Sequence, residues 1–412
     1  MIIIVKKLID FGSHGRIIEN GAIAVNRGKI LYAGPAGAII KRYPRHEIMR
    51  FPNAVIMPGL VNLHTHLELP PLLDLIRART YTEWVLNLIK IKRELGAKDY
   101  TLAVNQNIRT LIRTGTTTVA EICTHNISPK LLKQSGLRAM IYHEIISMDP
   151  SSLVTRLSSF VFRPSSLVHH GISPHAPHTV SAQMLHKIKE ISDRKKLHLC
   201  MHVAESKDEI RLLQGKRSGL ERLYAAANWD KAWAPSAQSS FEYLHRVGLL
   251  DTRFLAAHAV QTADNDIRLM KKTRVPVAHC PRSNKELGVG RMPLKKILDE
   301  GIIVGLGTDS LASAPSLSMW DEMRYACQIH RRDGITPKDV FNLATMGVAH
   351  ALGLDKEIGS LESGRRADII AVPLPAKNTG NIYSDLLRGT KSCIMTMVNG
   401  KILHMDRSRE NE

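Results

Sequence analysis

The chain of 412 residues is poor in cysteine, in aromatic residues and in long apolar runs. Its five cysteines contain no CxxC pair, and an odd count argues against a disulfide framework. Cys123, Cys200 and Cys280 sit in or beside apolar runs and are expected to be small core residues. No apolar run approaches the roughly 20 residues that span a bilayer, and residues 1–5 are too short for a signal peptide. We therefore expect a cytoplasmic protein with no membrane partner.

Acidic residues are also outnumbered, since 57 Lys and Arg against 38 Asp and Glu give a net charge of +19. A charge this high raises the question of nucleic-acid binding. The basic residues are, however, spread in short groups, and the aromatic residues, 5% of the chain, do not interleave with them. The HxE…PCxxC signature of zinc-dependent base deaminases is absent as well. A basic, solvated surface is the preferred interpretation, with no nucleic-acid partner.

What the chain does contain is a regular alternation of strand and helix patterns between two β-rich ends. Residues 1–54 and 359–412 consist of short apolar runs separated by turn signals, which predicts one small β-sandwich domain built from both termini. Residues 55–358 are predicted to form a (β/α)8 TIM barrel, because near-continuous apolar runs are typical of parallel strands covered on both faces. The predicted barrel strands are Val55–Leu63, Thr117–Ile122, Arg138–Glu144, Leu167–Ser173, Leu197–Val203, Phe254–Val260, Val275–Cys280 and Ile302–Leu306.

The ends of these predicted strands carry residues that can hold a metal. His64 and His66 are two apart, so their side chains share one face of a strand. His202 ends the fifth strand, and Asp309 follows the eighth. Three imidazoles and one carboxylate suit a single divalent ion, with Zn²⁺ as the first choice and Fe²⁺ as the alternative. Since barrel enzymes place their chemistry at the carboxyl ends of strands, this pattern predicts a metal-dependent enzyme.

Further polar residues near the same strand ends predict a hydrolytic site. Glu205 follows His202 by three positions, where a carboxylate could take a proton from water and pass it to a leaving group. His258 is interpreted as a residue that steadies the attacking hydroxide. His279 is left open between a similar contact and a buried structural role. No Lys ends the fourth strand to bridge two ions, so one metal is expected. The segment Gly215–Ser240, with Trp229, Trp233 and Pro235, is a candidate lid.

Across almost its whole length the chain resembles the amidohydrolase superfamily, and within it the metal-dependent aminohydrolases. The motifs that carry this resemblance are PGLVNLHTHLEL, TGTTTVAEI, ISPHAPHTV, MHVAES, AHAV, HCPRSN and GLGTDSLAS. The resemblance implies His64, His66, His202 and Asp309 as metal ligands. It implies catalytic roles for Glu205 as proton shuttle, for His258 beside the hydrolytic water, and for Asp309. It also implies a homo-oligomer that acts on a small molecule.

The resemblance further implies a substrate class and a reaction. Hydroxide held by the metal would attack an amino-bearing ring carbon and release ammonia. The opening HTHLEL and the segment 81–84 look like aminodeoxyfutalosine deaminases of menaquinone biosynthesis, which act on a 6-aminopurine nucleoside carrying a benzoate. Deamination of S-adenosylhomocysteine or methylthioadenosine, and hydrolysis of s-triazines, are the alternatives; Glu205 favours an amine as leaving group, since departing chloride needs no proton. The expected substrate contacts are Trp84, His175, Glu205, Arg282 and Ser313, with Arg282 and Arg291 as candidates to bind the carboxylate.

Overall fold

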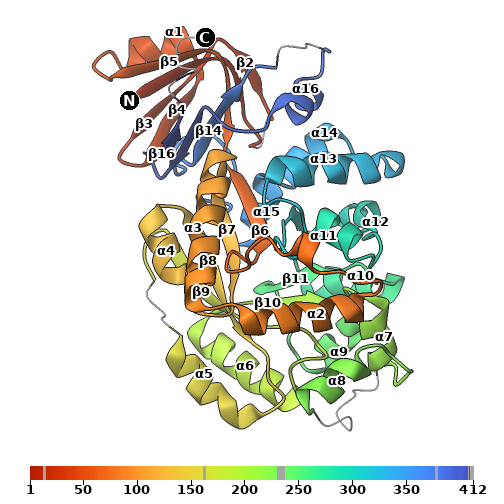
Figure 1. Ribbon diagram of the computed structural model, residues 1–412. Coiled ribbons are helices and arrows are strands. Elements are labelled where there is room, and N and C mark those ends of the chain that lie inside the picture. The colour runs from red at the N-terminus through yellow and green to blue at the C-terminus, as the bar shows by residue number, and fades with distance from the viewer. Residues whose placement is uncertain (13–14, 161–163, 230–236, 376–378, 407, 409–412) are drawn as a thin grey trace.

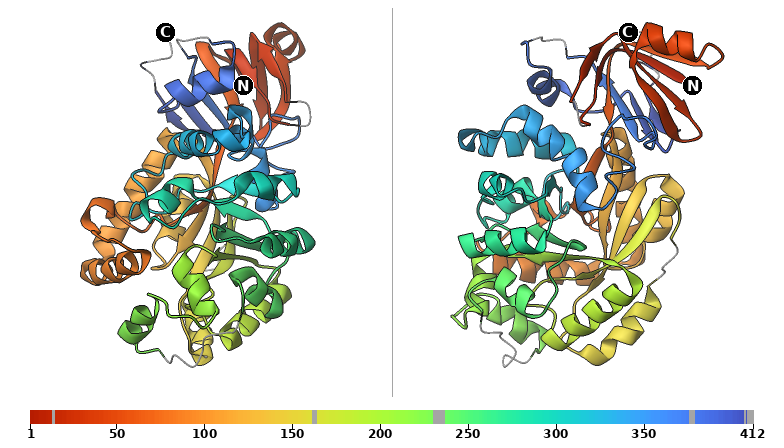
Figure 2. Two further views of the ribbon diagram at one scale, coloured as in Figure 1. Left: turned by 90° about the vertical axis from the view of Figure 1, so that its right-hand side faces the viewer. Right: turned by 180° about the vertical axis from the view of Figure 1, so that it is seen from behind.

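The computed structural model describes residues 1–12, 15–160, 164–229, 237–375, 379–406 and 408 (Figure 1). Two eight-stranded sheets organise these residues. One is built from both ends of the chain, and the other is formed by the middle. In both further views the sheet of the termini lies at one end of the barrel, with the N- and C-terminal ends close to it (Figure 2). Among the described residues no helix is both long and apolar enough to cross a bilayer.

The sheet of the termini is one continuous mixed sheet in the order β16-β15-β14-β5-β1-β3-β4, with β2 paired to β1. Its core joins both ends of the chain, because Ile3 and Ile23 pack in one cluster with Ile369 and Met397. The β-sandwich expected from the termini thus takes the form of a single sheet that encloses its own core. The strand bounds are β1 Ile2–Ile9, β2 Ile17–Glu19, β3 Gly21–Asn26, β4 Lys29–Pro35, β5 Ile48–Pro58, β14 Ile369–Pro373, β15 Met395–Val398 and β16 Lys401–Met405.

The middle of the chain forms the predicted barrel, with parallel strands in the order β6 to β13. The ends of the sheet meet at a parallel bridge between Thr65 and Asp309, which closes the barrel. The strands are short apolar segments that are buried over most of their length, as expected for a sheet covered by helices. Their bounds are β6 Leu60–Thr65, β7 Thr116–Cys123, β8 Arg138–Ile145, β9 Val168–Pro174, β10 His198–Val203, β11 Phe254–His258, β12 Val277–His279 and β13 Val304–Leu306.

Some of the helices between these strands begin at a polar residue whose side chain caps the first turn. Thr80 accepts a hydrogen bond from the Glu83 amide at the start of α2, and Ser181 does the same for Met184 in α6. The helix bounds are α1 Ala36–Arg42, α2 Tyr81–Glu94, α3 Ala97–Arg113, α4 Ser128–Ser135, α5 Leu153–Ser159, α6 Ala182–Lys195, α7 Lys207–Leu213, α8 Glu221–Ala227, α9 Ser240–Arg246, α10 Asp264–Thr273, α11 Pro281–Glu286, α12 Leu294–Asp299, α13 Met319–Ile329, α14 Pro337–Asn342, α15 Met346–Ala351 and α16 Ile382–Gly389.

The strand predicted over Val55–Leu63 is in fact two strands that belong to different sheets. β5 pairs with β14 of the terminal sheet up to Pro58, and β6 begins the barrel at Leu60. Gly59 lies between them, and a Cβ there would stand 2.2 Å from the Thr117 side chain. The apolar run is continuous across this point, so periodicity alone did not reveal the change of sheet.

One buried ion pair joins the two sheets. The Nε of Arg138, on β8, donates to Oδ2 of Asp368 at 2.9 Å, and its Nη2 donates to Oδ1 at 3.2 Å. The same carboxylate accepts the Asn399 amide at 2.8 Å, and the Asp368 carbonyl accepts the Gly59 amide at 2.9 Å. Because Arg138 is fully buried, its charge depends mainly on this close partner, with the partly exposed Glu357 carboxylate 3.8 Å from its Nη1. The pair therefore ties the terminal sheet to the barrel.

Candidate metal centre and active-site cavity

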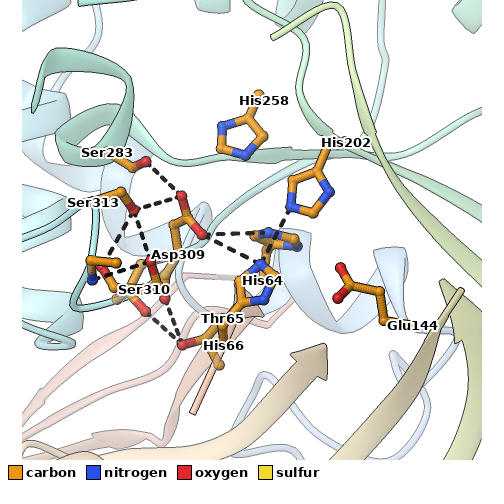
Figure 3. A network of polar contacts seen from close by, with 12 residues as sticks. His64, Thr65, His66, Glu144, His202, His258, Ser283, Asp309, Ser310 and Ser313 are labelled. Carbon is orange, nitrogen blue, oxygen red and sulfur yellow. Dashed lines mark hydrogen bonds and ion pairs between the residues drawn. The ribbon is translucent and has the colours of Figure 1, made fainter. Parts of the chain in front are cut away.

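The residues predicted to form the site come together at the carboxyl ends of the barrel strands (Figure 3). His64 and His66 come from the end of β6, His202 from β10 and His258 from β11, and Asp309 follows β13. The bridge that closes the barrel also holds the site, because the Asp309 amide donates to the His64 carbonyl at 3.0 Å. Thr65 points away from the histidines and donates through Oγ1 to the Asp309 carbonyl at 2.8 Å.

The nitrogen and oxygen atoms of this cluster are arranged to face a cation. The Nε2 atoms of His66 and His202 lie 3.3 Å apart. Oδ1 of Asp309 lies 3.5 Å from Nε2 of His66 and 3.8 Å from Nε2 of His64. The Nε2 atom of His64 is buried and has no hydrogen-bond partner. A metal is the partner that such a buried nitrogen lacks, so the donor set fits one Zn²⁺ or Fe²⁺.

The protonation states of the cluster also suit a metal. Burial lowers the pKa of His66 to about 4 and that of His64 well below its usual value, so both rings are neutral at pH 7. Burial alone would raise the pKa of Asp309, but the imidazoles of His258, His66 and His64 hold it below its usual range. Neutral imidazoles and an ionised carboxylate are the forms that bind metals.

Neighbouring groups fix the orientation of the candidate ligands. Nδ1 of His202 lies 2.8 Å from the His175 carbonyl, which makes Nδ1 the protonated nitrogen and leaves Nε2 free for a metal. Oδ2 of Asp309 accepts hydrogen bonds from Ser283 at 2.6 Å and from Ser313 at 2.8 Å, both through Oγ (Figure 3). The structure thus places Ser313, which was expected to contact substrate, against Asp309, where it orients the carboxylate.

His258 and Glu205 form the part of the site that can move a proton. Nδ1 of His258 lies 2.9 Å from Oδ1 of Asn284, while Nε2 lies 3.7 Å from Oε1 of Glu205. Burial raises the pKa of Glu205 to about 7, with the charge of Asp309 adding to the effect and the imidazole of His202 opposing it. A carboxyl group with this pKa can both accept and donate a proton near neutral pH.

Two residues that the sequence interpretation had not assigned hold Glu205 in place. Tyr81 donates from its hydroxyl to Oε2 of Glu205 at 2.8 Å. Glu209 accepts hydrogen bonds from the backbone amides of Ala204 at 2.8 Å and Glu205 at 3.1 Å.

Three residues of the site have a left-handed backbone conformation. The φ angle is 52° at Ala204, 73° at His258 and 55° at Asp309. Left-handed conformations in residues other than glycine cost energy and are concentrated at functional sites.

A cavity of about 320 Å³ opens over this cluster. Trp84 and His175, both expected to contact substrate, line it together with Glu205. Leu223, Ala227 and Trp229 of the candidate lid also line it, while Trp233 and Pro235 fall in 230–236, outside the described residues. The remaining lining residues are His66, Leu69, Tyr81, Val85, Leu88, Ile89, Lys92, Thr124, Glu144, Ile146, His178, Thr179, His202, Asp309 and Ser310.

The structure does not bring the two arginines expected to bind a carboxylate into this lining. Nη1 of Arg282 donates to Oγ of Ser316 at 2.9 Å and lies 3.7 Å from Oε1 of the fully buried Glu322. Arg291 pairs with Asp333 at 2.7 Å. Both cations therefore have carboxylate partners within the protein. Their positions after β12 were evident in the sequence, whereas their partners come from α13 and the residues that follow it.

His279 lies outside the cavity lining as well. Its Nε2 is 3.1 Å from Nε2 of His330, and the His279 side chain is fully buried. Of the two roles left open for this residue, the contacts favour the structural one.

Glu144 is a cavity residue that the sequence interpretation had missed. It is the last residue but one of β8 and stands apart from the dashed network in Figure 3. Burial alone would raise its pKa, but the imidazoles of His175 and His66 and the ammonium of Lys92 bring it to about 2. Its Oε2 accepts from Oγ1 of Thr124 at 2.7 Å, and its buried Oε1 has no hydrogen-bond partner. Its place in the apolar predicted strand Arg138–Glu144 was the only signal in the sequence.

Comparison with known families decides the class to which this site belongs. Residues 55–403 match the Amidohydrolase family. The chain belongs to the amidohydrolase family. This chain is therefore a hydrolase that acts on carbon–nitrogen bonds, and its barrel is the family's fold.

Individual relatives are similar to the chain over nearly its whole length. A 5-methylthioadenosine/S-adenosylhomocysteine deaminase of Moorella thermoacetica is 28% identical, over 97% of this chain and 94% of that protein. An adenosine deaminase of Xanthomonas campestris, solved with bound zinc, superposes with a TM-score of 0.84 at 24% identity, over 99% of this chain and 95% of that one. An aminofutalosine deaminase of Helicobacter pylori has a TM-score of 0.88 at 21% identity, over 97% and 99%.

Proposed function

We propose that the protein is a metal-dependent hydrolytic deaminase of a 6-aminopurine nucleoside, with aminodeoxyfutalosine as the first candidate substrate. The observation that carries the proposal is the position of Glu205. Its buried carboxyl group, with a pKa of about 7, lines the cavity beside the cluster of candidate metal ligands. Deamination needs a group there that takes a proton from water and returns it to nitrogen.

The residues proposed to hold the metal are His64, His66, His202 and Asp309. When bound, Zn²⁺ or Fe²⁺ supplies a Lewis acid that lowers the pKa of water toward neutrality. Zn²⁺ is preferred because three imidazoles and one carboxylate are a common zinc ligand set, and the zinc-containing relative has the same fold.

Side chains around the metal ligands are proposed to transfer protons, to orient the attacking water and to position the substrate ring. Glu205 accepts one proton of the attacking water at its carboxylate and donates it to the ring nitrogen beside the reacting carbon. It then takes the proton of the newly added hydroxyl group and donates it to the amine, which leaves as ammonia while the carbonyl forms. Tyr81 fixes the carboxylate of Glu205 through its hydroxyl. His258, whose Nδ1 lies 2.9 Å from Oδ1 of Asn284, can accept a hydrogen bond from the attacking water at its Nε2 and so orient that water. Trp84 and His175, on the cavity wall, position the ring.

The choice of substrate rests on the cavity and on the relatives. A methylthioadenosine/S-adenosylhomocysteine deaminase is among the curated relatives, which supports the purine nucleoside class. The apolar and aromatic wall formed by Trp84, Leu88, Ile89 and Trp229 suits a substrate with a further aromatic ring, which favours aminodeoxyfutalosine. Such a reaction would place the enzyme in menaquinone biosynthesis. Deamination of methylthioadenosine or S-adenosylhomocysteine is the second candidate.

Ammonia release from a panel of compounds tests the proposal. Purified protein of known metal content would be assayed with aminodeoxyfutalosine, S-adenosylhomocysteine, methylthioadenosine, adenosine, guanine, cytosine and a chloro-s-triazine. We expect the highest kcat/KM for aminodeoxyfutalosine at one metal per chain. If the enzyme preferred methylthioadenosine or S-adenosylhomocysteine, the substrate assignment would change and the proposed mechanism would stand. No ammonia from any of the nucleosides by metal-loaded protein would refute the proposal.

A further inference from the structure

One face of α2 forms a wall of the active-site cavity. The α2 residues that line the cavity are Tyr81, Trp84, Val85, Leu88, Ile89 and Lys92. Their spacing of three or four residues places them on one side of the helix. The stripe is aromatic at its start, where Tyr81 contacts Glu205, and aliphatic in the middle. It ends in a lysine in the last turn of the helix. A ligand bound in the cavity could pair an anionic group with this cation at the end of the apolar stripe.

Lys92 is the one Lys or Arg among the described residues that line this cavity. Its side chain is half-buried, and its ammonium makes no ion pair or hydrogen bond with the described part of the chain. Arg282 and Arg291, by contrast, both pair with carboxylates. The Lys92 side chain lines the same cavity as His66 and Glu144, so it faces the space that a substrate would fill. Lys92 is therefore a free cation at one end of the space above the metal ligands.

Glu144 is an acidic residue of the same cavity that could account for this cation. Its Oε2 is, however, held by the Thr124 hydroxyl at 2.7 Å, and within the described residues it forms no ion pair with Lys92. The residues of the stripe between Lys92 and the reacting centre are apolar or aromatic. A ligand that fills this space has an apolar body, with its reactive ring toward His66 and an anionic group toward Lys92.

We propose that Lys92 binds a negatively charged group of the substrate, a carboxylate or an equivalent anion, and so selects anionic over neutral substrates. This inference rests on the proposed function and adds the residue that selects substrates by their charge. A charge-assisted hydrogen bond in a partly dry site changes affinity by about 10- to 100-fold. Lys92 acts on binding and leaves the chemistry at Glu205 and His258 unchanged.

The test compares two substrates that differ only in this charge. The value of kcat/KM would be measured for aminodeoxyfutalosine and for its carboxamide, with neutral methylthioadenosine as a reference. We expect the wild type to favour the carboxylate by about 10- to 100-fold. Lys92→Gln should reduce that ratio to near one and leave the neutral compounds unchanged, while Lys92→Arg should keep most of it. The matched control is Lys90→Gln, which removes an exposed lysine of the same helix that does not line the cavity.

Two results would overturn the inference. One is an unchanged preference in Lys92→Gln. The other is an equal loss on charged and neutral compounds, which would mean that Lys92 serves to balance Glu144.

A binding measurement separates this inference from the proposed function. Calorimetry on metal-loaded wild type and Lys92→Gln would use 4-toluenesulfonate, an anionic ring that binds metals weakly, and its neutral methyl sulfone. We expect the wild type to bind the sulfonate at least tenfold more tightly than the sulfone, and the variant to bind both alike. This difference would support the anion site even if no nucleoside in the panel were deaminated. Equal binding of the two probes by the wild type, including no binding, refutes the anion site whatever the enzyme turns over.

Discussion

Replacing Glu205 with glutamine tests the proposed proton transfer directly, because Glu205 is the group proposed to carry the proton. The Glu205 carboxyl group is buried, and its raised pKa of about 7 means that the site accommodates the neutral form near neutral pH. A neutral amide of the same shape should therefore be tolerated. Tyr81 can still donate its hydroxyl hydrogen bond, now to the amide oxygen. We expect Glu205→Gln to fold and to keep its metal, because Glu205 is not among the clustered ligand atoms of His64, His66 and His202.

Turnover, in contrast, should nearly vanish. General acid–base catalysis by a positioned side chain contributes roughly 10²- to 10⁴-fold. Glu205 is proposed to act at both the ring nitrogen and the departing amine, so we expect a loss near the upper end. A 10³- to 10⁴-fold decrease in kcat corresponds to about 4–5.5 kcal/mol in the barrier.

The assay is ammonia release under saturating substrate, combined with metal analysis and thermal unfolding of the same preparation. Glu83→Gln provides a control, because this glutamate lies in the first turn of α2, outside the cavity lining. A Glu205→Gln enzyme that holds its metal and retains turnover within tenfold of the wild type would refute the proton-shuttle assignment. If turnover and metal were lost together, Glu205 would instead be required for metal binding.

Three further substitutions test the surrounding structure. His202→Ala should lose bound metal, measured by elemental analysis after dialysis, and retention of one ion per chain would contradict its assignment as a ligand. Tyr81→Phe removes the hydrogen bond to Glu205 and should lower kcat by roughly 10- to 150-fold at unchanged metal content, since a hydrogen bond to a charged group is worth about 1.5–3 kcal/mol. Asp368→Asn leaves the buried Arg138 with the more distant Glu357 carboxylate, 3.8 Å from its Nη1, as its remaining counter-charge. It should lower the free energy of unfolding by up to about 3–5 kcal/mol in a denaturant titration; a change below about 1 kcal/mol would show that the ion pair does not hold the two sheets together.

The local sequence was sufficient to predict the barrel and the residues gathered at its mouth. Buried parallel strands are apolar at nearly every position, so their number and order are visible without any contact information. Once the strands are known, the geometry of a parallel barrel brings all their carboxyl ends to one face. His64, His66, His202, His258 and Asp309 therefore had to lie near one another.

Long-range packing determined which charged residues face the cavity, and the sequence did not indicate this. Arg282 follows a barrel strand and was expected to meet the substrate, but Asp321 and Glu322 on α13 approach it from 39 and 40 residues further along the chain. Lys92 shares its helix with one other lysine, Lys90, and it is Lys92 that lines the cavity because of how α2 packs beside α8 over the barrel. The energy of a charged side chain depends on partners that are close in space rather than in sequence, and those partners become known when the helices are placed against the strands.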